Sequence, residues 1–292
     1  MIDRYLIRYF LAVVDHGNFS RAAAACHVSQ PTLSIGIAKL EKELGAPLFI
    51  RSNQRVALTA GGAQFQIHAR RIEREFHSAV QAMAGQTAPP ALRIGLLTSI
   101  PGAIIAQALR RIDLGEGRAS LELLGGTERE LAGYLAKGRI EVALTLVQRG
   151  GERFHEQVLR REGYALAMPG QHQLAGRKSV DADELASEVM IVRRHCEALS
   201  ETSRFFTEQG VRPHFAYRST NDERVLLMVA AGLGITVMPD SYHAPDVARP
   251  KLAGFRAERV LGFAFAHHAQ DLIGDPPPIL QALAREMGYS TG

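Results

Sequence analysis

The stretch SRAAAACHVSQPTLSIGIAKLEKELG, residues 20–45, predicts two short helices joined by a tight turn. We expect the first helix to begin at Ser20, because a serine hydroxyl can accept one of the unpaired backbone N–H groups of a helix start. The second helix has a capping serine at Ser29, Pro31 in its first turn, and Gly45 where a left-handed residue would end it. The second helix is therefore delimited at both ends by local sequence.

This second helix has one apolar face and one basic face. Side chains spaced i, i+4, i+7 and i+11 form one buried stripe, and here they are Leu33, Ile37, Leu40 and Leu44. The opposite face carries no acidic residue and consists of Pro31, Ile35, Ala38, Lys39 and Lys42. Such a helix can enter the major groove of DNA with its lysines near phosphates. The same pattern also fits a helical hairpin in an α-rich domain, with solvated lysines.

Residues 46–59, APLFIRSNQRVALT, predict two short strands around a turn at 52–54. Arg51 and Arg55 flank the tip of this hairpin. A basic hairpin directly after a basic helix is typical of the wing of a winged helix-turn-helix, which favours DNA binding over the helical-hairpin alternative.

Residues 1–62 resemble the winged helix-turn-helix of LysR-type transcriptional regulators. The positions that carry the resemblance are Phe10, Val14, Gly17, Phe19, Ser20, Ala22, Ala23, Val28, Ser29, Gln30, Pro31, Leu33, Ser34, Ile37, Leu40, Glu41, Leu44, Gly45, Leu48, Phe49, Arg51, Leu58, Thr59, Gly61 and Gly62. Ile35 and Gly36 depart from the pattern, because members often carry polar groups there, and Gly61 replaces the usual alanine. The resemblance implies a DNA-binding regulator with fewer side-chain donors available for bases.

The resemblance and the helix faces together give the residues expected at DNA. We expect base edges to be contacted from the start of the second helix, with Ile35 against a thymine methyl. Lysines and wing arginines are expected at phosphates or in the minor groove. The expected DNA-binding set is Ser29, Gln30, Pro31, Thr32, Ser34, Ile35, Lys39, Lys42, Arg51, Asn53 and Arg55.

Charge is distributed unevenly along the 292 residues, whose formal net charge is +4. The first 87 residues contain 10 Lys and Arg against 6 Asp and Glu, whereas the rest contains 24 of each. A basic head on a neutral body indicates a polyanionic partner for the head. The sequence has no run of 18 apolar residues and no secretion signal, so we expect a cytoplasmic protein that does not bind membranes.

Residues 61–85 predict a long amphipathic helix with a nearly heptad stripe of apolar side chains, Phe65, Ala69, Ile72, Phe76, Val80 and Met83. A helix of about 25 residues spans roughly 37 Å and needs a partner for such a stripe. We expect a homodimer through this helix; packing on the chain's own second domain is the alternative. The resemblance favours the dimer and implies homotetramers as a further assembly. Residues 86–90 contain paired prolines and predict a hinge.

From residue 91 onward, short apolar runs alternate with helical segments, which predicts a two-lobed α/β domain. The expected strands are 92–97, 120–125, 141–147, 164–169, 189–192, 215–219, 234–239 and 260–266, the last returning to the first lobe. The expected helices are 100–112, 127–137, 196–209 and 221–231, with capping boxes at Thr127 and Thr220. This arrangement resembles the effector-binding domain of the same family, itself similar to periplasmic solute-binding proteins. The expected domains are 1–59, 60–90 and 91–292.

Ligands of such sheets bind at the carboxyl ends of the strands. A helix begins soon after Thr98 and Ser99, and a helix N-terminus with nearby arginines, among them Arg193, can hold an anion. We therefore expect a small anionic effector such as a carboxylate. The alternative is that each arginine pairs with an acid and each Ser or Thr caps a helix. The expected effector-binding set is Thr98, Ser99, Thr127, Leu146, Gln148, Arg194, His195, Cys196, Arg218, Thr220 and Asn221.

Two cysteines, Cys26 and Cys196, do not form a disulfide framework. In the peroxide-sensing branch of the family, a cysteine in a stretch similar to that of Cys196 is oxidised and then resolved by a second one. No second cysteine is near Cys196 in the sequence, so we expect it to line the ligand pocket or the core. Catalytic motifs and metal-ligand spacings are missing from the sequence, and we expect no enzyme, metal or cofactor. The competing function is a solute sensor whose head only dimerises.

Overall fold

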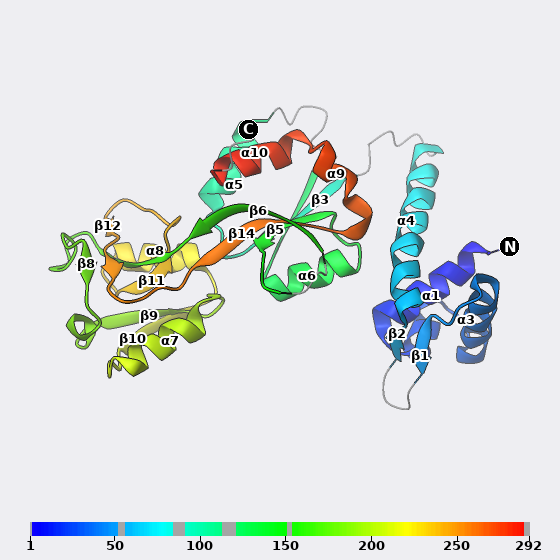
Figure 1. Ribbon diagram of the computed structural model, residues 1–292, viewed down its shortest axis with the longest axis horizontal. Helices are drawn as coiled ribbons and strands as arrows, with labels where there is room; N and C mark the ends of the chain where they lie inside the picture. Colours follow the sequence, from blue (N-terminus) through cyan, green and yellow to red (C-terminus); the bar gives the residue numbers. More distant parts are fainter. Residues whose placement is uncertain (1, 52–55, 84–90, 113–120, 151–153, 289–292) are drawn as a thin grey trace.

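The N-terminal residues form a helical head with a small wing (Figure 1). The computed structural model of the chain describes residues 2–51, 56–83, 91–112, 121–150 and 154–288. The head consists of α1 (Arg4–His16), α2 (Phe19–Ala25), α3 (Gln30–Leu44) and the antiparallel strands β1 (Phe49–Arg51) and β2 (Val56–Leu58). Leu33, Ile37 and Leu40 of the expected stripe are fully buried against Leu6 and Phe10 of α1. The predicted winged helix-turn-helix is confirmed.

The helix ends of the head agree with the sequence in α3 and differ in α2. Ser29 caps α3 by accepting the N–H of Thr32 at 3.2 Å, and Gly45 ends it with φ of 69°. The expected start of the first helix at Ser20 is wrong. The helix begins at Phe19 and is capped by Asn18, whose side-chain oxygen accepts the N–H of Ser20 at 2.8 Å. Asn18 is in the extended conformation that a capping residue requires, and Ser20 is already helical.

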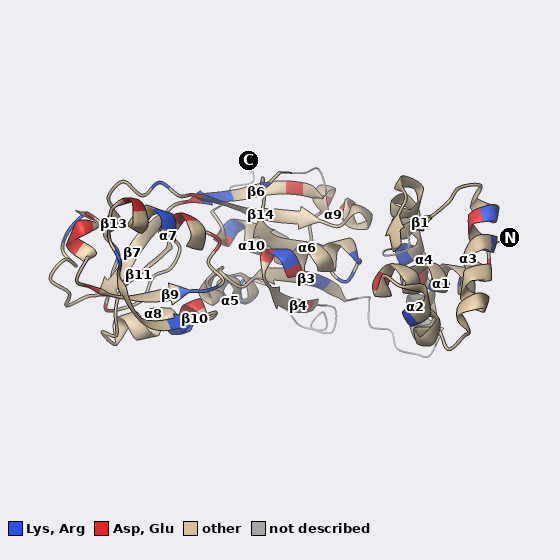
Figure 2. Cartoon of the chain, turned by 90° about the horizontal axis from the view of Figure 1, so that it is seen from below, with Lys and Arg blue, Asp and Glu red and all other residues tan. Residues whose placement is uncertain are grey.

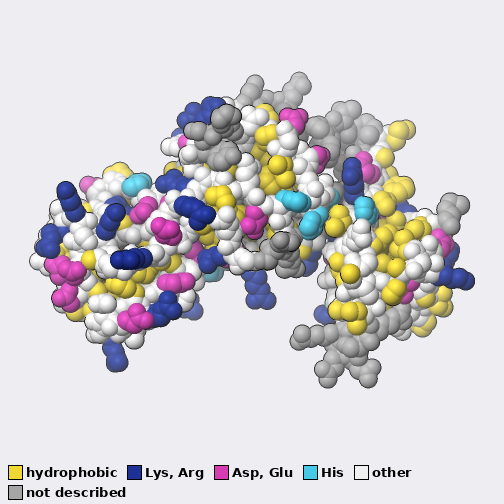
Figure 3. Space-filling view, in the orientation of Figure 1, with side chains coloured by type: hydrophobic (Ala, Val, Ile, Leu, Met, Phe, Trp, Pro, Cys, Tyr) yellow, Lys and Arg dark blue, Asp and Glu magenta, His cyan; other side chains and the backbone are white. Residues whose placement is uncertain are grey.

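The long helix α4 (Ala60–Met83) follows the wing. Its apolar stripe divides into two parts. Ala69 is fully buried and Phe65 and Ile72 pack against the core of the head, whereas Phe76, Val80 and Met83 are 46%, 62% and 89% exposed. Figure 3 shows hydrophobic side chains along this helix. The head therefore covers only the first half of the stripe. The predicted hinge at 86–90 lies outside the described residues.

Lobe I of the C-terminal domain is built on a sheet with strand order β4-β3-β5-β14-β6. Its strands are β3 (Leu92–Leu97), β4 (Leu121–Gly126), β5 (Val142–Leu146), β6 (His155–Glu162) and β14 (Arg259–Phe265). β3 is parallel to β4 and β5, and β14 is antiparallel to β5 and β6. Its helical segments are α5 (Gly102–Arg110), α6 (Glu128–Ala136), η3 (His267–Ala269), α9 (Asp271–Gly274) and α10 (Pro278–Glu286).

Lobe II comprises residues 163–258 and contains short sheets covered by two helices. Its main strands are β7 (Tyr164–Pro169), β9 (Val189–Arg193), β10 (His214–Ser219) and β11 (Thr236–Pro239), and its helices are α7 (Leu199–Glu208) and α8 (Asp222–Ala230). Smaller elements are β8 (Ser179–Val180), η2 (Asp183–Leu185), β12 (Val247–Ala248) and β13 (Lys251–Leu252). β9 and β10 pair parallel, and β11 and β12 flank β7 antiparallel. Figure 2 shows acidic and basic segments interspersed over this lobe.

Two strands, β6 and β14, join the lobes (Figure 1). The return of strand 260–266 to lobe I was predicted and is observed as β14. β6 was not predicted, because its sequence HEQVLRRE is mostly charged and lacks an apolar run. Only Leu159 and Glu162 of that strand are buried, so most of its charged side chains stay at the surface. In the described part of the chain, no helix is long and apolar enough to cross a membrane.

Candidate DNA-reading surface and effector site

The N-terminal half of α3 exposes the side chains expected at base edges. The hydroxyls of Ser29 and Thr32 are hydrogen-bonded at 2.7 Å, and Gln30 Nε2 donates to Ser34 Oγ at 3.1 Å. These bonds hold the polar side chains of the first turn in one arrangement. Ile35 is 70% exposed, so its apolar side chain is available to an external partner. Pro31 is also exposed.

The two lysines of α3 have different surroundings. Lys39 Nζ lies 3.3 Å from Asp3 Oδ2 and 6.0 Å from the ring centre of Tyr5. The hydrogen bond to Asp3, followed by the interaction with Tyr5, raises the pKa of Lys39. Lys42 lies in the last turn of the helix and is exposed. A phosphate at Lys39 would therefore have to compete with Asp3.

The glycine in the middle of α3 is explained by packing against α1. A Cβ at Gly36 would lie 2.7 Å from Tyr9 Cδ2 and 3.1 Å from Tyr9 Cε2, and the first of these distances is closer than real side chains come. Tyr9 in turn meets Tyr5 edge-on, with ring centres 5.5 Å apart. The departure from the family pattern at this position therefore lets an aromatic ring of α1 lie directly on the reading helix.

The wing is attached to α3 by a carboxylate. Glu41 Oε1 accepts the backbone N–H groups of Leu48 and Phe49 at 2.8 and 3.3 Å, just before and at the start of β1. Among the wing residues expected at DNA, Asn53 and Arg55 lie outside the described residues, and so does the side chain of Arg51. Glu41 therefore fixes where the wing starts relative to the reading helix.

At the junction of the lobes, Ser99 is buried and bonded to an arginine that sequence reasoning did not single out. Arg259 Nη1 donates to both Ser99 O and Ser99 Oγ at 3.0 Å. The fully buried Arg259 side chain also pairs with Glu162 Oε1 at 2.6 Å and with Glu197. Tyr164 donates its hydroxyl to Glu197 at 2.9 Å. Residues of lobe I, lobe II and both connecting strands thus meet in one buried network.

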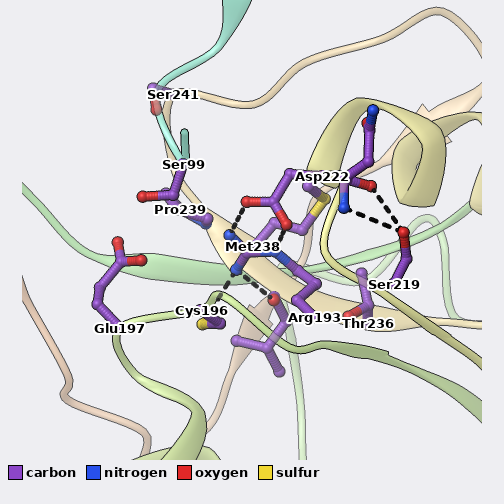
Figure 4. A network of polar contacts seen from close by, with 12 residues as sticks. Ser99, Arg193, Cys196, Glu197, Ser219, Asp222, Thr236, Met238, Pro239 and Ser241 are labelled. Atoms are coloured by element: carbon purple, nitrogen blue, oxygen red, sulfur yellow. Dashed lines mark hydrogen bonds and ion pairs between the residues drawn. The ribbon is translucent and has the colours of Figure 1, made fainter. Parts of the chain in front are cut away.

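Arg193, which was expected to close on an anion, is paired within the protein (Figure 4). Its guanidinium forms a two-pronged ion pair with Asp222, with one N–H···O bond of 2.8 Å. Nη1 also donates to Val237 O and Cys196 Sγ, each at 3.2 Å. Both charged side chains are almost completely buried. The alternative, an arginine paired with an acid, is what the structure contains at this position.

At the start of α5, where we expected an anion-binding site, a carboxylate of the chain itself is bound. Gly102 N donates to Glu223 Oε1 at 2.8 Å, so lobe II supplies the anion to a helix of lobe I. Thr98 is exposed and its backbone N–H bonds Gly126 O at 3.0 Å. An external carboxylate would have to displace Glu223 to bind at this helix.

The other expected effector residues are spread over the edges of both lobes. Thr127 forms the predicted capping box of α6 with Glu130, and hydrogen bonds from Thr127 are the main cause that lowers the pKa of Glu130, with a smaller contribution from His195. The predicted capping box at Thr220 is wrong. Asn221 caps α8 by accepting Arg224 N at 2.8 Å, because it directly precedes the helix.

Exposure separates the remaining members of the expected set. Leu146 is buried in β5, whereas Gln148 is exposed, has φ of 60°, and donates its N–H to Glu156 at 2.8 Å. Arg194, His195, Arg218 and Thr220 are exposed. The guanidinium of Arg218 lies 5.5 Å from the ring centre of Phe215.

Cys196 faces a cavity in lobe II next to Arg193. Burial raises the pKa of the Cys196 thiol, and the nearby charge of Arg193 opposes that effect. Sequence reasoning identified this cysteine but missed Glu162, Glu197 and Arg259. No local pattern identifies these three, because their partners are distant in the sequence. Within the described residues, no cluster of His, Cys, Asp and Glu has a geometry that could hold a metal ion.

Comparison with known proteins covers both parts of the chain. Residues 5–63 match the family described as "Bacterial regulatory helix-turn-helix protein, lysR family", and residues 85–271 match the "LysR substrate binding domain". The chain is 31% identical over 247 residues to the "DNA-binding transcriptional dual regulator OxyR" of Escherichia coli, across 83% of this chain and 81% of that protein. It is 31% identical over 236 residues to a "Hydrogen peroxide-inducible genes activator" of Pectobacterium carotovorum subsp. carotovorum, across 80% and 78% of the two chains.

Among solved structures, a full-length OxyR variant of Pseudomonas aeruginosa has the same fold, with a TM-score of 0.56 and 22% sequence identity over 100% of this chain and 96% of that chain. The match of the head to a regulatory helix-turn-helix favours DNA binding over the competing function, in which the head only dimerises. From both halves of the sequence, the chain belongs to the LysR family of transcriptional regulators.

Proposed function

We propose that this LysR-type regulator reads operator DNA with the first two turns of α3. Gln30, Thr32, Ser34 and Ile35 lie on this exposed segment, and the N-terminal residues of a reading helix approach base edges. Lys39, Lys42, Arg51 and Arg55 supply the phosphate contacts, and Ser29, Pro31 and Asn53 complete the surface. The observation that carries this proposal is the 70% exposure of Ile35 beside exposed polar and basic side chains of α3.

The test is a binding series with single base-pair changes in an operator. Ile35→Ala removes an apolar contact, so we expect preference to change at one base pair, where a thymine methyl is recognised. Lys42→Gln is the control, because a phosphate contact weakens binding to all sequences alike. If Ile35→Ala reduced affinity equally for every operator variant, Ile35 would serve packing and the reading proposal would be wrong.

We further propose that the chain acts as a homodimer through the exposed end of α4, and that dimers pair into tetramers. Val80 and Met83, together with the part of Phe76 that the Arg4 guanidinium does not cover, leave an exposed apolar stripe on this helix, which a second copy can bury. Val80→Asp should shift the chain toward monomer in sedimentation and reduce operator binding, because two half-sites are then no longer read together. Glu75→Ser, an exposed change on the same helix, is the matched control.

For the effector, we propose a small carboxylate at the junction of the lobes, with exposed Arg194, His195 and Arg218 at its rim. Such an anion would take the place of the Glu223 carboxylate at the N–H of Gly102. Glu223→Gln removes the competing charge and should increase thermal stabilisation by added carboxylates. Equal stabilisation of parent and variant would contradict binding at this helix.

A second candidate signal is peroxide, since several relatives are named hydrogen peroxide-inducible activators and Cys196 Sγ lies 3.2 Å from Arg193 Nη1. In this reaction the thiolate attacks one peroxide oxygen and the O–O bond breaks, which gives a sulfenic acid and hydroxide. Cys26 belongs to the head, so we expect no intrachain disulfide. Trapping with dimedone should label parent and Cys26→Ser protein but not Cys196→Ser protein, and an unlabelled Cys26→Ser variant would rule this signal out.

We propose that the chain divides into three parts, residues 1–59, 60–90 and 91–292. We propose that it acts in the cytoplasm, where operator DNA is found, and that it has no catalytic activity of its own.

A further inference from the structure

A cavity of about 780 Å³ lies inside lobe II, between α7 and the strands β9 and β11. Its residues include Met190 and Ile191 of β9, Thr202 and Phe206 of α7, Phe215 of β10 and Val237 of β11. A volume of this size falls in the range of small-molecule sites, about 300–1,000 Å³. The cavity lies within one lobe and adjoins the interlobe junction, where the carboxylate is proposed.

The three threonine hydroxyls around the cavity are already bonded to the backbone. Thr202 Oγ1 donates to Ala198 O at 2.7 Å, and Thr236 Oγ1 donates to Ile191 O at 2.8 Å. Thr207 Oγ1 likewise donates to a backbone carbonyl of α7, at 2.9 Å. With their O–H protons bound in this way, these side chains offer mainly methyl groups to an occupant. Polar ligands would find few donors among them.

The buried arginine in the cavity wall is already paired. Arg193 lines the cavity, but its guanidinium is held by Asp222 in a nearly fully buried ion pair. An anionic ligand would have to compete with that carboxylate and lose its own hydration in an apolar space. The wall therefore disfavours anions.

The opening of the cavity carries exposed apolar side chains. Leu199 is 37% exposed and Phe215 is 40% exposed, and both line the cavity. Arg218 covers the ring of Phe215 from outside, with its guanidinium 5.5 Å from the ring centre. An apolar molecule can therefore enter along surfaces that are themselves apolar.

From this chemistry we propose that the cavity binds a neutral, largely apolar small molecule, as a second ligand site of the regulator. Cys196 and Glu197 both line this cavity. Cys196 Sγ accepts from Arg193, and Glu197 accepts from Arg259, which bonds Ser99 of lobe I. An occupant thus contacts residues that belong to the network between the lobes, and it shields the thiol.

The site can be tested with N-phenyl-1-naphthylamine, a neutral apolar fluorescent probe, on the full chain without DNA. The chain contains no tryptophan, so an introduced one is a single reporter. Thr202→Trp fills the cavity from α7, and Arg204→Trp places the same side chain on the opposite, exposed face of that helix. A tryptophan inside the cavity should emit at shorter wavelength than the one at position 204.

We expect saturable probe fluorescence in the parent, an affinity at least about tenfold weaker in Thr202→Trp, and a change below about twofold in Arg204→Trp. In the Cys26→Ser background, bound probe should slow alkylation of Cys196 by N-ethylmaleimide. Ser203→Leu, a milder filling on the same face of α7, should weaken binding if Thr202→Trp fails to fold.

The proposal is overturned if the parent shows no saturable binding, if filled variants bind as well as the parent, or if the probe leaves the alkylation rate unchanged. Operator affinity of the unliganded variants is measured in parallel. It should stay within about twofold of the parent, because α3 lies outside lobe II. Probe binding therefore tests the cavity, and operator affinity separately tests the proposed DNA binding.

Discussion

The reading helix α3 and the junction between the lobes both carry polar and charged side chains, but they use them in opposite ways. In α3 the expected contact residues are exposed apart from the half-buried Ser34, and their hydrogen bonds connect close neighbours such as Gln30 and Ser34. At the junction, Arg193 and Arg259 are buried and paired with carboxylates of the same chain. The polar side chains of α3 are available to an external partner, whereas the charged side chains at the junction are already paired within the chain.

The difference has an energetic consequence. Exposed ion pairs contribute little to stability, whereas removal of one partner of a buried pair leaves an uncompensated charge. Substitutions in α3 should therefore alter recognition with little effect on folding, and substitutions at the junction should alter folding first. The junction polar groups are structural unless a ligand replaces one of their partners.

The largest effect is expected from Arg259→Met, which leaves Glu162 and Glu197 buried without their shared cation. The free energy of unfolding of the C-terminal domain should fall by about 3–5 kcal/mol, measured in urea. Arg160→Met is the matched control, because Arg160 lies 3.6 Å from Glu162 but its side chain is partly exposed. Similar losses in the two variants would contradict the distinction between buried and exposed pairs.

A second effect concerns acid, through Glu141 at the start of β5. Burial raises the pKa of Glu141, but the His268 imidazole, 4.0 Å from Glu141 Oε1, and the hydrogen bonds from Arg93 outweigh that effect and lower the pKa to about 2. A folded-state pKa below the ordinary value means that the contribution is complete above about pH 4.5 and is lost as the pH falls toward 2. Partial exposure reduces this contribution, which we place at roughly 2–3 kcal/mol.

Urea unfolding of parent and Glu141→Gln protein at pH 7 and pH 3 measures how much the ionised Glu141 carboxylate contributes to the free energy of unfolding. The variant should be less stable at pH 7, and the gap should narrow at pH 3. A gap that is independent of pH would show that the carboxylate charge is not what stabilises this edge of lobe I. Glu122, an exposed acid on β4 of the same sheet, provides the control variant Glu122→Gln.

The third prediction tests packing beneath the reading helix. Gly36→Ala brings a Cβ to 2.7 Å from Tyr9 and should destabilise the head by about 1–3 kcal/mol. Adding Tyr9→Leu should restore part of this loss. Gly133→Ala in α6 is the control, because a Cβ there meets nothing within 4 Å, and the helix should gain up to about 1 kcal/mol. Equal melting temperatures of parent and Gly36→Ala would mean that α1 and α3 separate easily.

The same contrast explains what could be predicted from the sequence. Helix caps and strands depend on neighbours a few residues away, so Ser29, Gly45 and the capping box at Thr127 were found. Two caps were misplaced, at Ser20 and Thr220, because asparagines nearer the helix start were better positioned. The ion pairs join residues 29 and 97 positions apart, and sequence spacing cannot select among many distant acids.

The smallest effect is expected from the two lysines of α3. It tests whether a lysine's contribution to operator affinity is reduced when that lysine is already paired within the chain. Lys42→Gln should reduce the slope of log affinity against log salt concentration by about 1, the value for one phosphate contact. Lys39→Gln should reduce it by less, because Lys39 is already paired with Asp3. Asp3→Asn should then raise operator affinity by freeing Lys39, whereas Asp3→Asn in a Lys39→Gln background should change nothing. If Lys39→Gln and Lys42→Gln gave the same change in slope while Asp3 is present, the exposed Lys39–Asp3 pair would not compete with phosphate. Pairing within the chain would then limit binding to an external partner only at buried sites, where water is excluded.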